Sequence, residues 1–386
     1  MEGERNSVRP VLTPVRSQTG IYPMLARIPG VQLLFLGPQA CTRHGLISTL
    51  QELHRKMAFL CLTETEVITG RYLDKTAEAA GELVRRRKAS SLLLITCCQN
   101  ALVGTDYDRL ITRIQGELGL PVKYLEVNRL QMYARRKGAL MSRPTEQLIY
   151  DFLLPREKSA RPWVNLIGPP GVRGDGETAA FLQMAGAERV YTIDRCGDFA
   201  GYQDMAGAHL NVALTWSGEE TARYLEEKLG IPWLPLNAGY DEELLARQYM
   251  DLGAFLGCDA GGWLRRAREC LEKRLEGLER TLPELEVDGR GAADGIALTN
   301  WLWRRGFAVK TVWLDSWSGR EERAEEWLTA HHPETALCRQ PYRPALNPTP
   351  PDQLRRPVHR PIFPTGYEVL HQAVEQLEAM TGGGER

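Results

Sequence analysis

Two cysteines stand just beyond apolar runs, and their type and placement point most clearly to chemistry. Cys41 closes the turn Gly37-Pro-Gln-Ala-Cys41 after the run 31–36, and Cys98 follows the run 91–95. Short, nearly continuous apolar runs ended by turn residues are typical of strands buried on both faces of a parallel sheet. In open parallel sheets, chemistry collects at the carboxyl ends of the strands. We therefore predict that the two thiolates meet in space, although no local Cys-x-x-Cys motif joins them.

Each cysteine also has a structural interpretation, because cysteine is often buried and then packs as a small hydrophobe. We predict Cys41 and Cys98 as ligands, since thiolate ligands belong at exposed turns rather than in strand interiors. Cys97 lies closer to the strand and is expected to pack in the core, but a shift of one residue would exchange its role with that of Cys98. For Cys61, ligation and core packing both remain open.

Strand-like apolar runs alternate with amphipathic helical stretches along the chain, which predicts an α/β fold with mainly parallel sheets. Three such blocks are present. They predict an N-terminal domain at 1–158 with the cluster cysteines, a second domain with bridging helices at 159–280, and a third domain with a C-terminal helix at 281–386. The charged segment 155–162 is predicted to be a linker.

The expected elements follow from the same patterns. Strand-like segments are expected at 31–36, 91–95, 122–126, 163–167, 189–193, 211–215, 230–235, 285–288, 308–313 and 335–338. Helices are expected from about residue 45, and at 75–87, 106–118, 177–185, 219–229, 241–278, 292–305, 321–330 and 366–380. The proline-rich stretch 341–364 is expected to be loop, and 382–386 a frayed tail.

Charge and composition exclude several classes of protein. The 386 residues carry a formal charge of -1 at pH 7. A net charge this close to zero does not indicate binding to nucleic acid or to an anionic membrane surface. No run approaches the roughly 18 apolar residues of a membrane span, and the first residues lack the features of a signal peptide. We expect a cytoplasmic protein. There, the eight cysteines stay reduced, which leaves metal ligation, redox chemistry or burial.

A glycine-rich segment, Gly168-Pro-Pro-Gly-Val-Arg-Gly-Asp-Gly176, resembles a phosphate-binding loop. Glycine amides at a helix start can cradle anions. However, no Lys-Ser or Lys-Thr follows, and the chain contains no Walker A sequence. If ATP drives this system, a separate protein must hydrolyse it.

Four motifs in register resemble the nitrogenase component 1 superfamily, which includes the nitrogenase molybdenum-iron protein chains and dark-operative protochlorophyllide reductase. They are Gly37-Pro-Gln-Ala-Cys41, Leu62-Thr-Glu-Thr-Glu-Val-Ile-Thr-Gly70, Cys98 with Leu102-Val-Gly-Thr-Asp106, and Glu226-Glu-Lys-Leu-Gly-Ile-Pro-Trp233. The resemblance spans nearly the whole chain and is weakest after about residue 280. Each motif alone is loose, and the four together are reasonably specific.

The resemblance implies three Rossmann-like domains and a nitrogenase-like oxidoreductase component. In this family Cys41 and Cys98 match cysteines that hold an iron-sulfur cluster at a subunit interface. A [4Fe-4S] cluster needs four ligands, so two subunits giving two thiolates each would complete it. The implied partners are a second component 1-like subunit, in a homodimer or heterodimer, and an ATPase iron-sulfur reductase that supplies electrons for a substrate in the interdomain cleft.

Two departures from the family pattern limit this analogy. Residues 1–40 contain no cysteine, so a simple cubane is expected rather than a larger cluster, with Cys61 as a candidate for the missing thiolate. Leu214 and Thr215 stand where nitrogenase holds its cofactor with a cysteine, so reduction of dinitrogen by this chain alone is not expected. A cofactor-assembly scaffold of the nitrogenase maturation type and a degenerate structural partner subunit remain alternative functions.

Overall fold

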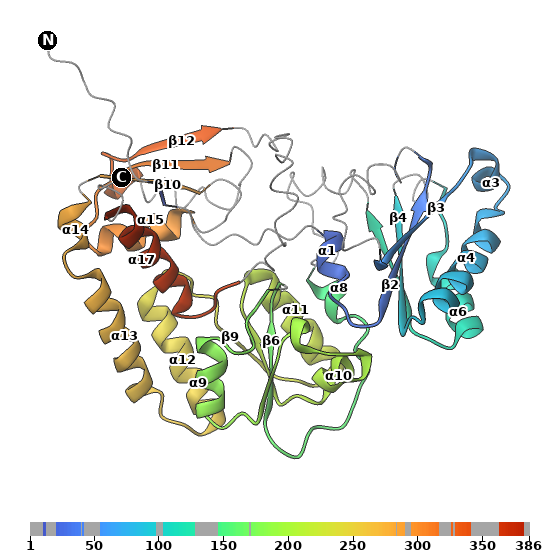
Figure 1. Ribbon diagram of the computed structural model, residues 1–386, viewed down its shortest axis with the longest axis horizontal. Coiled ribbons are helices and arrows are strands. Elements are labelled where there is room, and N and C mark those ends of the chain that lie inside the picture. Colours follow the sequence, from blue (N-terminus) through green and yellow to red (C-terminus); the bar gives the residue numbers. More distant parts are fainter. Residues whose placement is uncertain are drawn as a thin grey trace, which may run out of the picture.

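Among the residues that the structure describes, the strands form three four-stranded sheets, and every strand pair is parallel. The structure is a computed structural model, and it describes residues 11–12, 21–39, 41, 55–97, 103–127, 146–169, 171–282, 284–289, 295–315, 326, 329–340 and 363–381. The sheets are called N-terminal, central and C-terminal below. Figure 1 shows the central sheet between the other two.

The N-terminal sheet has the strand order β3-β2-β4-β5. Its strands are β2 (Val31–Gly37), β3 (Met57–Cys61), β4 (Ser91–Cys97) and β5 (Val122–Val127). Helices α3 (Glu64–Ile68), α4 (Tyr72–Arg87) and α6 (Tyr107–Leu118) lie on its outer side, and α1 (Ile21–Leu25) and α8 (Gln147–Tyr150) on its inner side (Figure 1). All residues of β2 and β4 are buried, because helices cover both faces.

The central sheet repeats this strand order as β7-β6-β8-β9. Its strands are β6 (Trp163–Ile167), β7 (Arg189–Tyr191), β8 (Leu210–Ala213) and β9 (Trp233–Pro235). The connecting helices are α9 (Glu177–Met184), η2 (Ile193–Arg195), α10 (Phe199–Asp204), η3 (Met205–Gly207) and α11 (Trp216–Leu229). In both sheets the first strand of the block, β2 or β6, is an inner strand with neighbours on both sides. The chain first adds a strand on one side of it and then crosses to the other side, so the switch points lie between β2 and β4 and between β6 and β8. Such switch points are where open α/β sheets bind ligands.

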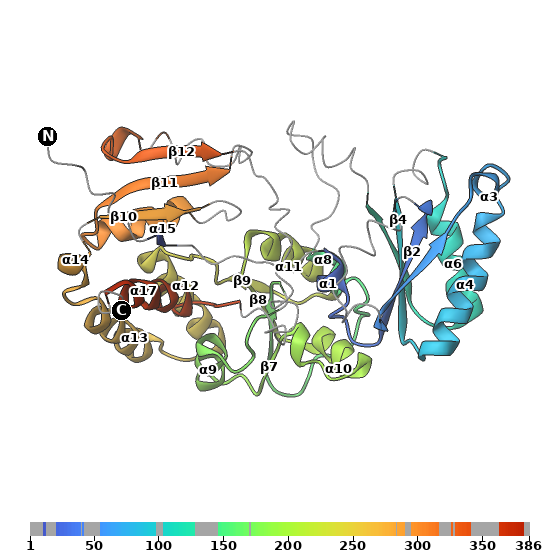
Figure 2. The same cartoon turned by 45° about the horizontal axis from the view of Figure 1, so that its top comes forward.

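The C-terminal sheet has the order β1-β10-β11-β12. Its strands are β1 (Val11–Leu12), β10 (Leu285–Asp288), β11 (Val309–Asp315) and β12 (Ala336–Gln340). The helices around it are α12 (Glu242–Leu256), α13 (Gly261–Leu275), α14 (Leu278–Thr281), α15 (Gly295–Arg304) and α17 (Glu368–Thr381). Strands β11 and β12 end towards the middle of the molecule (Figure 2).

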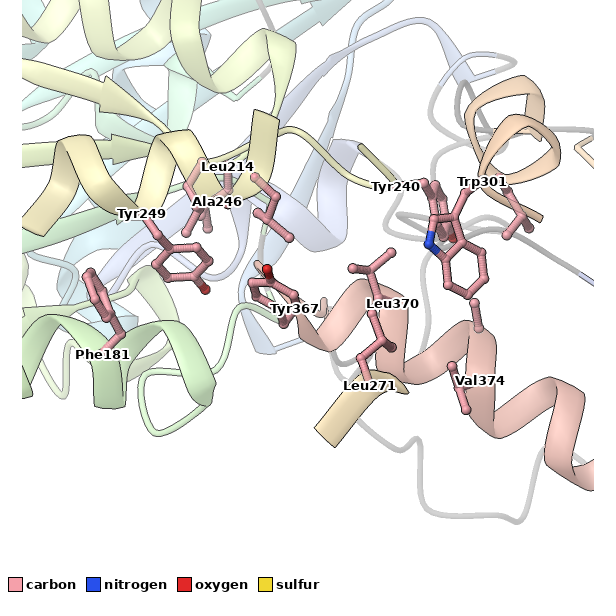
Figure 3. Close-up of a cluster of buried hydrophobic side chains, with 14 of the residues drawn as sticks. Phe181, Leu214, Tyr240, Ala246, Tyr249, Leu271, Trp301, Tyr367, Leu370 and Val374 are labelled. Atoms are coloured by element: carbon pink, nitrogen blue, oxygen red, sulfur yellow. The ribbon is translucent and has the colours of Figure 1, made fainter. Parts of the chain in front are cut away.

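Apolar cores join neighbouring sheets. One core combines side chains of the central and C-terminal sheets with α12, α13 and α17, and Figure 3 shows Tyr249, Tyr367 and Trp301 in it. A second core lies between the N-terminal and central sheets, and it contains Phe35 of β2 and Ile167 of β6. A third fills the outer side of the N-terminal sheet. The relative position of the sheets is therefore stabilised by buried apolar surface.

The structure confirms the predicted α/β fold with parallel sheets and departs from the expected elements at several points. β3 was not expected. The expected helix 241–278 is divided into α12, α13 and α14, because Gly257 ends α12 in the left-handed conformation with φ of 77°. β1 pairs with β10, so the strand at 11–12 lies in the C-terminal sheet, whereas the predicted boundary at 158 placed it with the N-terminal sheet. The domain boundaries at 158 and 280 otherwise stay a prediction.

Some expected elements lie outside the described residues. They are the start of the helix expected from about residue 45, most of the helix at 321–330, the first residues of the helix at 292–305, nearly all of the loop at 341–364 and the tail at 382–386.

Candidate functional site

Cys41 returns to the end of β2 through a tight turn. Gly37 ends β2, and its carbonyl accepts a hydrogen bond from the amide of Leu62 at 2.9 Å. The Cys41 amide donates to the Pro38 carbonyl at 3.0 Å, which reverses the chain. As a result, the Cys41 Cβ lies 3.6 Å from the position that a Cβ on Gly37 would take. The turn Gly37-Pro-Gln-Ala-Cys41 thus places the half-buried Cys41 at the edge of the sheet where β2 ends.

Cys97 is the cysteine that the structure places beside Cys41. Its Sγ lies 3.0 Å from the position of a Cβ on Gly37, and only 4% of the residue is exposed. Both cysteines therefore lie close to the position that a side chain on Gly37 would take. Cys97 ends β4 on the same face as Phe35 of β2, since both belong to the core between the N-terminal and central sheets.

Cys61 lies at the same edge. It ends β3, where its Cα pairs with that of Gly37, and it is exposed. Met57 and Phe59 of β3 contact the inner core, and side chains alternate along a strand, so Cys61 shares their face. The carbonyl of Cys61 accepts a hydrogen bond from Lys75 Nζ at 3.4 Å. β3, β2 and β4 thus bring Cys61, Gly37 and Cys97 to one end of the sheet.

Cys98 lies outside the described residues, so its place relative to Cys41 stays a prediction. In the part of the chain that is described, no three His, Cys, Asp or Glu side chains gather closely enough to hold a metal ion. The described residues therefore do not form a complete metal site by themselves.

Two aromatic rings lie on the inner side of the sheet near Gly37. Tyr22 of α1 and Phe35 of β2 meet edge to face, with ring centroids 6.3 Å apart, and Phe35 Cε1 lies 3.3 Å from the Cβ position of Gly37. Burial raises the pKa of Tyr22, and negative charge on Cys41 and Cys97 raises it further. We call Tyr22, Phe35, Cys41 and Cys97 the Gly37 cluster.

The carboxylates near Cys61 have a structural role. Thr63 and Glu66 form a capping box at the start of α3: the Glu66 amide donates to Thr63 Oγ1 at 3.3 Å, and Glu66 Oε2 accepts from the Thr63 amide at 2.8 Å. Lys75 donates to Glu66 as well, and these hydrogen bonds lower the pKa of Glu66 to about 2. A group that stays ionised at neutral pH has no proton to give, so Glu66 is not a catalytic acid there.

The motif around Gly104 and Asp106 also shapes the backbone. Gly104 has φ of 65°, which favours glycine, and Asp106 Oδ1 caps α6 by accepting from the Arg109 amide at 3.0 Å. The hydroxyls of Thr105 and Tyr72 lie 2.5 Å apart and connect this turn to α4. Both turns at the sheet edge are therefore held in place by hydrogen bonds.

The glycine-rich segment after β6 does not offer its amides to a phosphate. In its described part, the Gly171 amide donates to Asp194 and the Glu177 amide donates to Glu368 Oε1 at 2.9 Å. A Cβ on Gly176 would lie 2.5 Å from the same Glu368 oxygen. Carboxylates of the chain itself therefore occupy the anion-binding positions, in agreement with the missing Walker A lysine.

A half-buried carboxyl group, that of Glu146, lies at the switch point of the central sheet. Thr215 follows β8 and caps α11 by accepting from the Gly218 amide at 2.8 Å, and its hydroxyl donates to Glu146 Oε2 at 2.9 Å. Burial raises the pKa of Glu146, while hydrogen bonds from Thr215 and Ser217 oppose this shift. Directly after β8, this chain thus has a helix cap bound to a carboxyl group.

Sequence reasoning overlooked Tyr22 and Glu146, whereas Cys97 packs in the inner core as expected. An apolar run that ends in Cys97-Cys98 does not say which thiol faces the neighbouring turn. No local signal marks Tyr22 or Glu146, because each acquires its neighbours only when segments distant in sequence come together.

The fold defines a class of α/β proteins that contain three parallel four-stranded sheets. The family model of the nitrogenase component 1 type oxidoreductases matches residues 20–288. The chain belongs to this family, which confirms the resemblance seen in its motifs.

Solved structures agree on the fold. The chain is similar to nitrogenase Cp1 at pH 6.5, with a TM-score of 0.63 and 16% identity over 99% of this chain and 95% of the other. It is also similar to nitrogenase Cp1 at pH 5, with a TM-score of 0.50 and 14% identity over 94% of this chain and 78% of the other. A search of curated proteins found no match. Among the described residues, no helix is long and apolar enough to cross a membrane.

Proposed function

We propose that this chain is a nitrogenase-like oxidoreductase component that shares an iron-sulfur cluster with a second component 1-like subunit. Cys41 and Cys98 are the proposed ligands, with Cys61 as a third candidate, and the cluster is expected to be a [4Fe-4S] cubane. The family suggests an ATPase iron-sulfur reductase as the electron donor. If ATP drives the reaction, this partner must hydrolyse it, because the chain has no Walker A sequence. The cluster, when bound, relays single electrons to a substrate in the interdomain cleft.

The observation that supports this proposal is that Cys41 lies close to the end of β4, next to Gly37. The chain that holds these residues belongs to the component 1 family. Cys98 directly follows Cys97 in the sequence, so the proposed ligands Cys41 and Cys98 are expected at the same carboxyl end of the sheet, which suits a cluster shared at an interface. At the switch point of the central sheet, Glu146 offers a carboxyl group held by Thr215 and Ser217. Such a group can supply protons when electrons reach a substrate.

The test is iron and acid-labile sulfide per chain in anaerobically purified protein, with an electron paramagnetic resonance spectrum after reduction by dithionite. About two irons per chain and a cubane spectrum are expected for one cluster shared by two chains. Cys41→Ala is expected to lose the iron while keeping its circular dichroism spectrum. Cys270→Ala, which changes an exposed cysteine of α13, is the matched control and should keep it.

Iron retained in Cys41→Ala would contradict the ligand assignment. Protein that is iron-free and resists reconstitution would favour the degenerate partner subunit. Iron-loaded protein that consumes no electrons from its reductase with any candidate substrate would favour the assembly scaffold.

A further inference from the structure

The segment 363–368, which leads into α17, lies across the glycine-rich loop 171–176 that follows β6. Phe363 forms a parallel bridge with Val172, and its amide donates to the Gly171 carbonyl at 2.8 Å. In Figure 1 the red segment before α17 runs to the central sheet. We call residues 363–368 the strap. The strap covers the loop at the carboxyl end of β6, beside the switch point of the central sheet.

Glu368, the last residue of the strap, fastens it to the start of α9. One of its carboxyl oxygens accepts the Glu177 amide at 2.9 Å, and the other accepts the Thr365 amide at 3.1 Å. The Thr365 hydroxyl also donates to Thr178 Oγ1 at 2.8 Å, and both threonines are buried. These hydrogen bonds join α17 to α9 and close the strap over the loop.

The carboxyl group of Glu177 lies within one side-chain length of the amide that Glu368 accepts. Its Oε1 is buried, and among the described residues no group donates a hydrogen bond to it. An ionised carboxylate in this position would lack the donors that a buried charge needs. Burial and negative charge on Glu368 raise the pKa of Glu177 to about 8. Glu177 is therefore protonated at neutral pH while the strap is closed.

The charged and titratable groups around Glu177 come from several elements: Glu368 and Tyr367 of α17 and its start, Tyr249 of α12, Arg268 of α13, and Arg173 and Asp175 of the loop. Negative charge on Glu177 raises the pKa of both phenols, and Figure 3 shows these tyrosines in the shared core. Arg268 interacts with Tyr367 and lowers the pKa of that phenol. Arg173 pairs with Asp175 at 3.3 Å. Glu368 is thus the charge that acts on Glu177.

We propose that the strap is a proton-dependent latch, which stays closed over the loop 171–176 while Glu177 is protonated and opens when this carboxyl group ionises. Opening frees the Glu177 amide and uncovers the carboxyl end of β6, where open α/β sheets bind ligands. The start of the loop stays attached, because the Gly171 amide donates to Asp194. The inference goes beyond the proposed function, since it involves neither the cysteines nor a cluster, and each can fail without the other.

The direction of the pH dependence follows from the two states of the strap. In the closed state Glu177 keeps its proton up to about pH 8, whereas in water it ionises near its ordinary value of 4.5. Between these values opening releases a proton, so the opening equilibrium rises with pH by at most about tenfold per pH unit. A strap held by packing and backbone hydrogen bonds alone predicts no such rise.

The experiment is hydrogen-deuterium exchange of the full chain at pH 6 and pH 8, with labelling times scaled for the pH dependence of the chemical exchange rate. The amides of Glu177, Phe363 and Thr365 report on the strap, and those of β8 report on global unfolding. Wild type is compared with Glu177→Gln and Glu368→Gln. Glu375→Gln is the matched control, because it changes an exposed glutamate of α17.

From pH 6 to pH 8, wild type and Glu375→Gln are expected to lose protection at the strap amides by up to about 100-fold. Protection in Glu177→Gln should not depend on pH, because its side chain cannot ionise. Glu368→Gln keeps Glu177 buried but removes the neighbouring charge, so its loss should be smaller than in wild type.

Protection that does not change with pH in wild type would overturn the inference, and so would a wild-type pH dependence in Glu177→Gln. If Glu177→Gln fails to fold, a wild-type pH dependence in Glu368→Gln would overturn it instead. Strap amides that exchange no faster than those of β8 would also overturn it, because the strap would then open only on global unfolding. Loss of the pH dependence in Glu375→Gln would show that the effect does not belong to Glu177.

Discussion

At the scale of single residues, the lack of a side chain on Gly37, at the end of β2, lets neighbouring side chains pack closely at this edge of the sheet. Side chains from three segments approach the point where a Cβ on Gly37 would lie: Cys97 Sγ at 3.0 Å, Phe35 Cε1 at 3.3 Å and Cys41 Cβ at 3.6 Å. Contacts this short leave no room for a methyl group unless the thiol of Cys97 moves.

Gly37→Ala is expected to lower the free energy of unfolding by about 1–3 kcal/mol, the usual cost of overpacking, and to lower iron incorporation. Urea unfolding and iron content measure the two effects. Gly116→Ala is the control, because no atom lies within 4 Å of a Cβ at this position of α6, and it should be neutral or stabilising. A normal iron content in Gly37→Ala would show that the thiols tolerate a methyl group between them.

At the scale of elements, two carboxyl groups meet at the start of α9. Glu368 of α17 accepts the Glu177 amide and, at 3.1 Å, the Thr365 amide. The Glu177 carboxyl lies close by, and among the described residues its Oε1 has no hydrogen-bond partner. Burial first, and negative charge on Glu368 second, raise the pKa of Glu177 to about 8. The contact between α9 and α17 therefore depends on a protonated carboxyl group.

This contact predicts a pH dependence of stability. The pKa of Glu177 rises from its ordinary value of 4.5 to about 8 on folding, so between these values the folded chain holds a proton that the unfolded chain has lost. The stability that the protonated Glu177 carboxyl contributes to the folded state is fully present below about pH 4.5 and is lost as pH rises to about 8. The free energy of unfolding falls over this range by at most about 1.4 kcal/mol per pH unit. Unfolding by urea between pH 5 and 8 should show a weaker pH dependence in Glu177→Gln. Equal slopes in the variant and wild type would contradict the assignment.

Two exposed apolar side chains stand on the turns beside the cysteine edge. Ile68, at the end of α3, is 81% exposed, and Val103 is 50% exposed. They flank the hydrogen bond between Tyr72 and Thr105. If the proposed function is correct, these two side chains are candidates for the surface on which the ATPase reductase docks.

Ile68→Glu is expected to slow reductase-driven electron consumption by roughly tenfold or more, as for a docking residue worth about 1.4 kcal/mol or more. Its iron content and its reduction by dithionite should remain normal. Met250→Glu is a matched control, since Met250 of α12 is 57% exposed and lies away from the cysteine edge. Equal slowing in both variants would show that added charge, rather than a lost contact, is responsible.

At the scale of the whole molecule, polar contacts reinforce the shared cores. Arg305, after α15, donates to Glu242 of α12 at 2.8 Å and to Glu272 of α13 at 2.6 Å. The Trp301 indole donates to the same Glu242 at 2.7 Å. Arg305 and Glu242 are about 20% exposed, at 21% and 19%, so solvent screens this pair less than it screens a surface pair. The network attaches the C-terminal sheet to the bridging helices.

Arg305→Met is expected to lower the free energy of unfolding by about 1–3 kcal/mol, because it leaves Glu242 partly buried without its cation. Thermal and urea unfolding measure the loss. Arg86→Met breaks a pair with Glu82 whose side chains are 76% and 56% exposed, and it should change stability by less than about 0.5 kcal/mol. Equal effects in the two variants would show that the network does not stabilise the sheet arrangement.

Much of the fold follows from local sequence. The apolar runs that became β2 and β4, and the helices α4, α6 and α9, lie within three residues of the expected positions. The start of α11 was expected three residues late, because Thr215 acts as its cap. β3 was missed although its five residues are all apolar, and β1 was missed because two residues carry no periodicity.

By itself, the sequence determined the class of fold, the family and the presence of thiols at strand ends, because hydrophobic periodicity and turn residues act locally. The tertiary structure decided which groups meet. Register across β3, β2 and β4 placed Cys61, Gly37 and Cys97 at one edge, and packing of α1 brought Tyr22 to them. Pairing of Val11 and Leu12 with β10 carried the start of the chain into the C-terminal sheet. Such contacts depend on burial and pairing between distant segments, which no local pattern encodes.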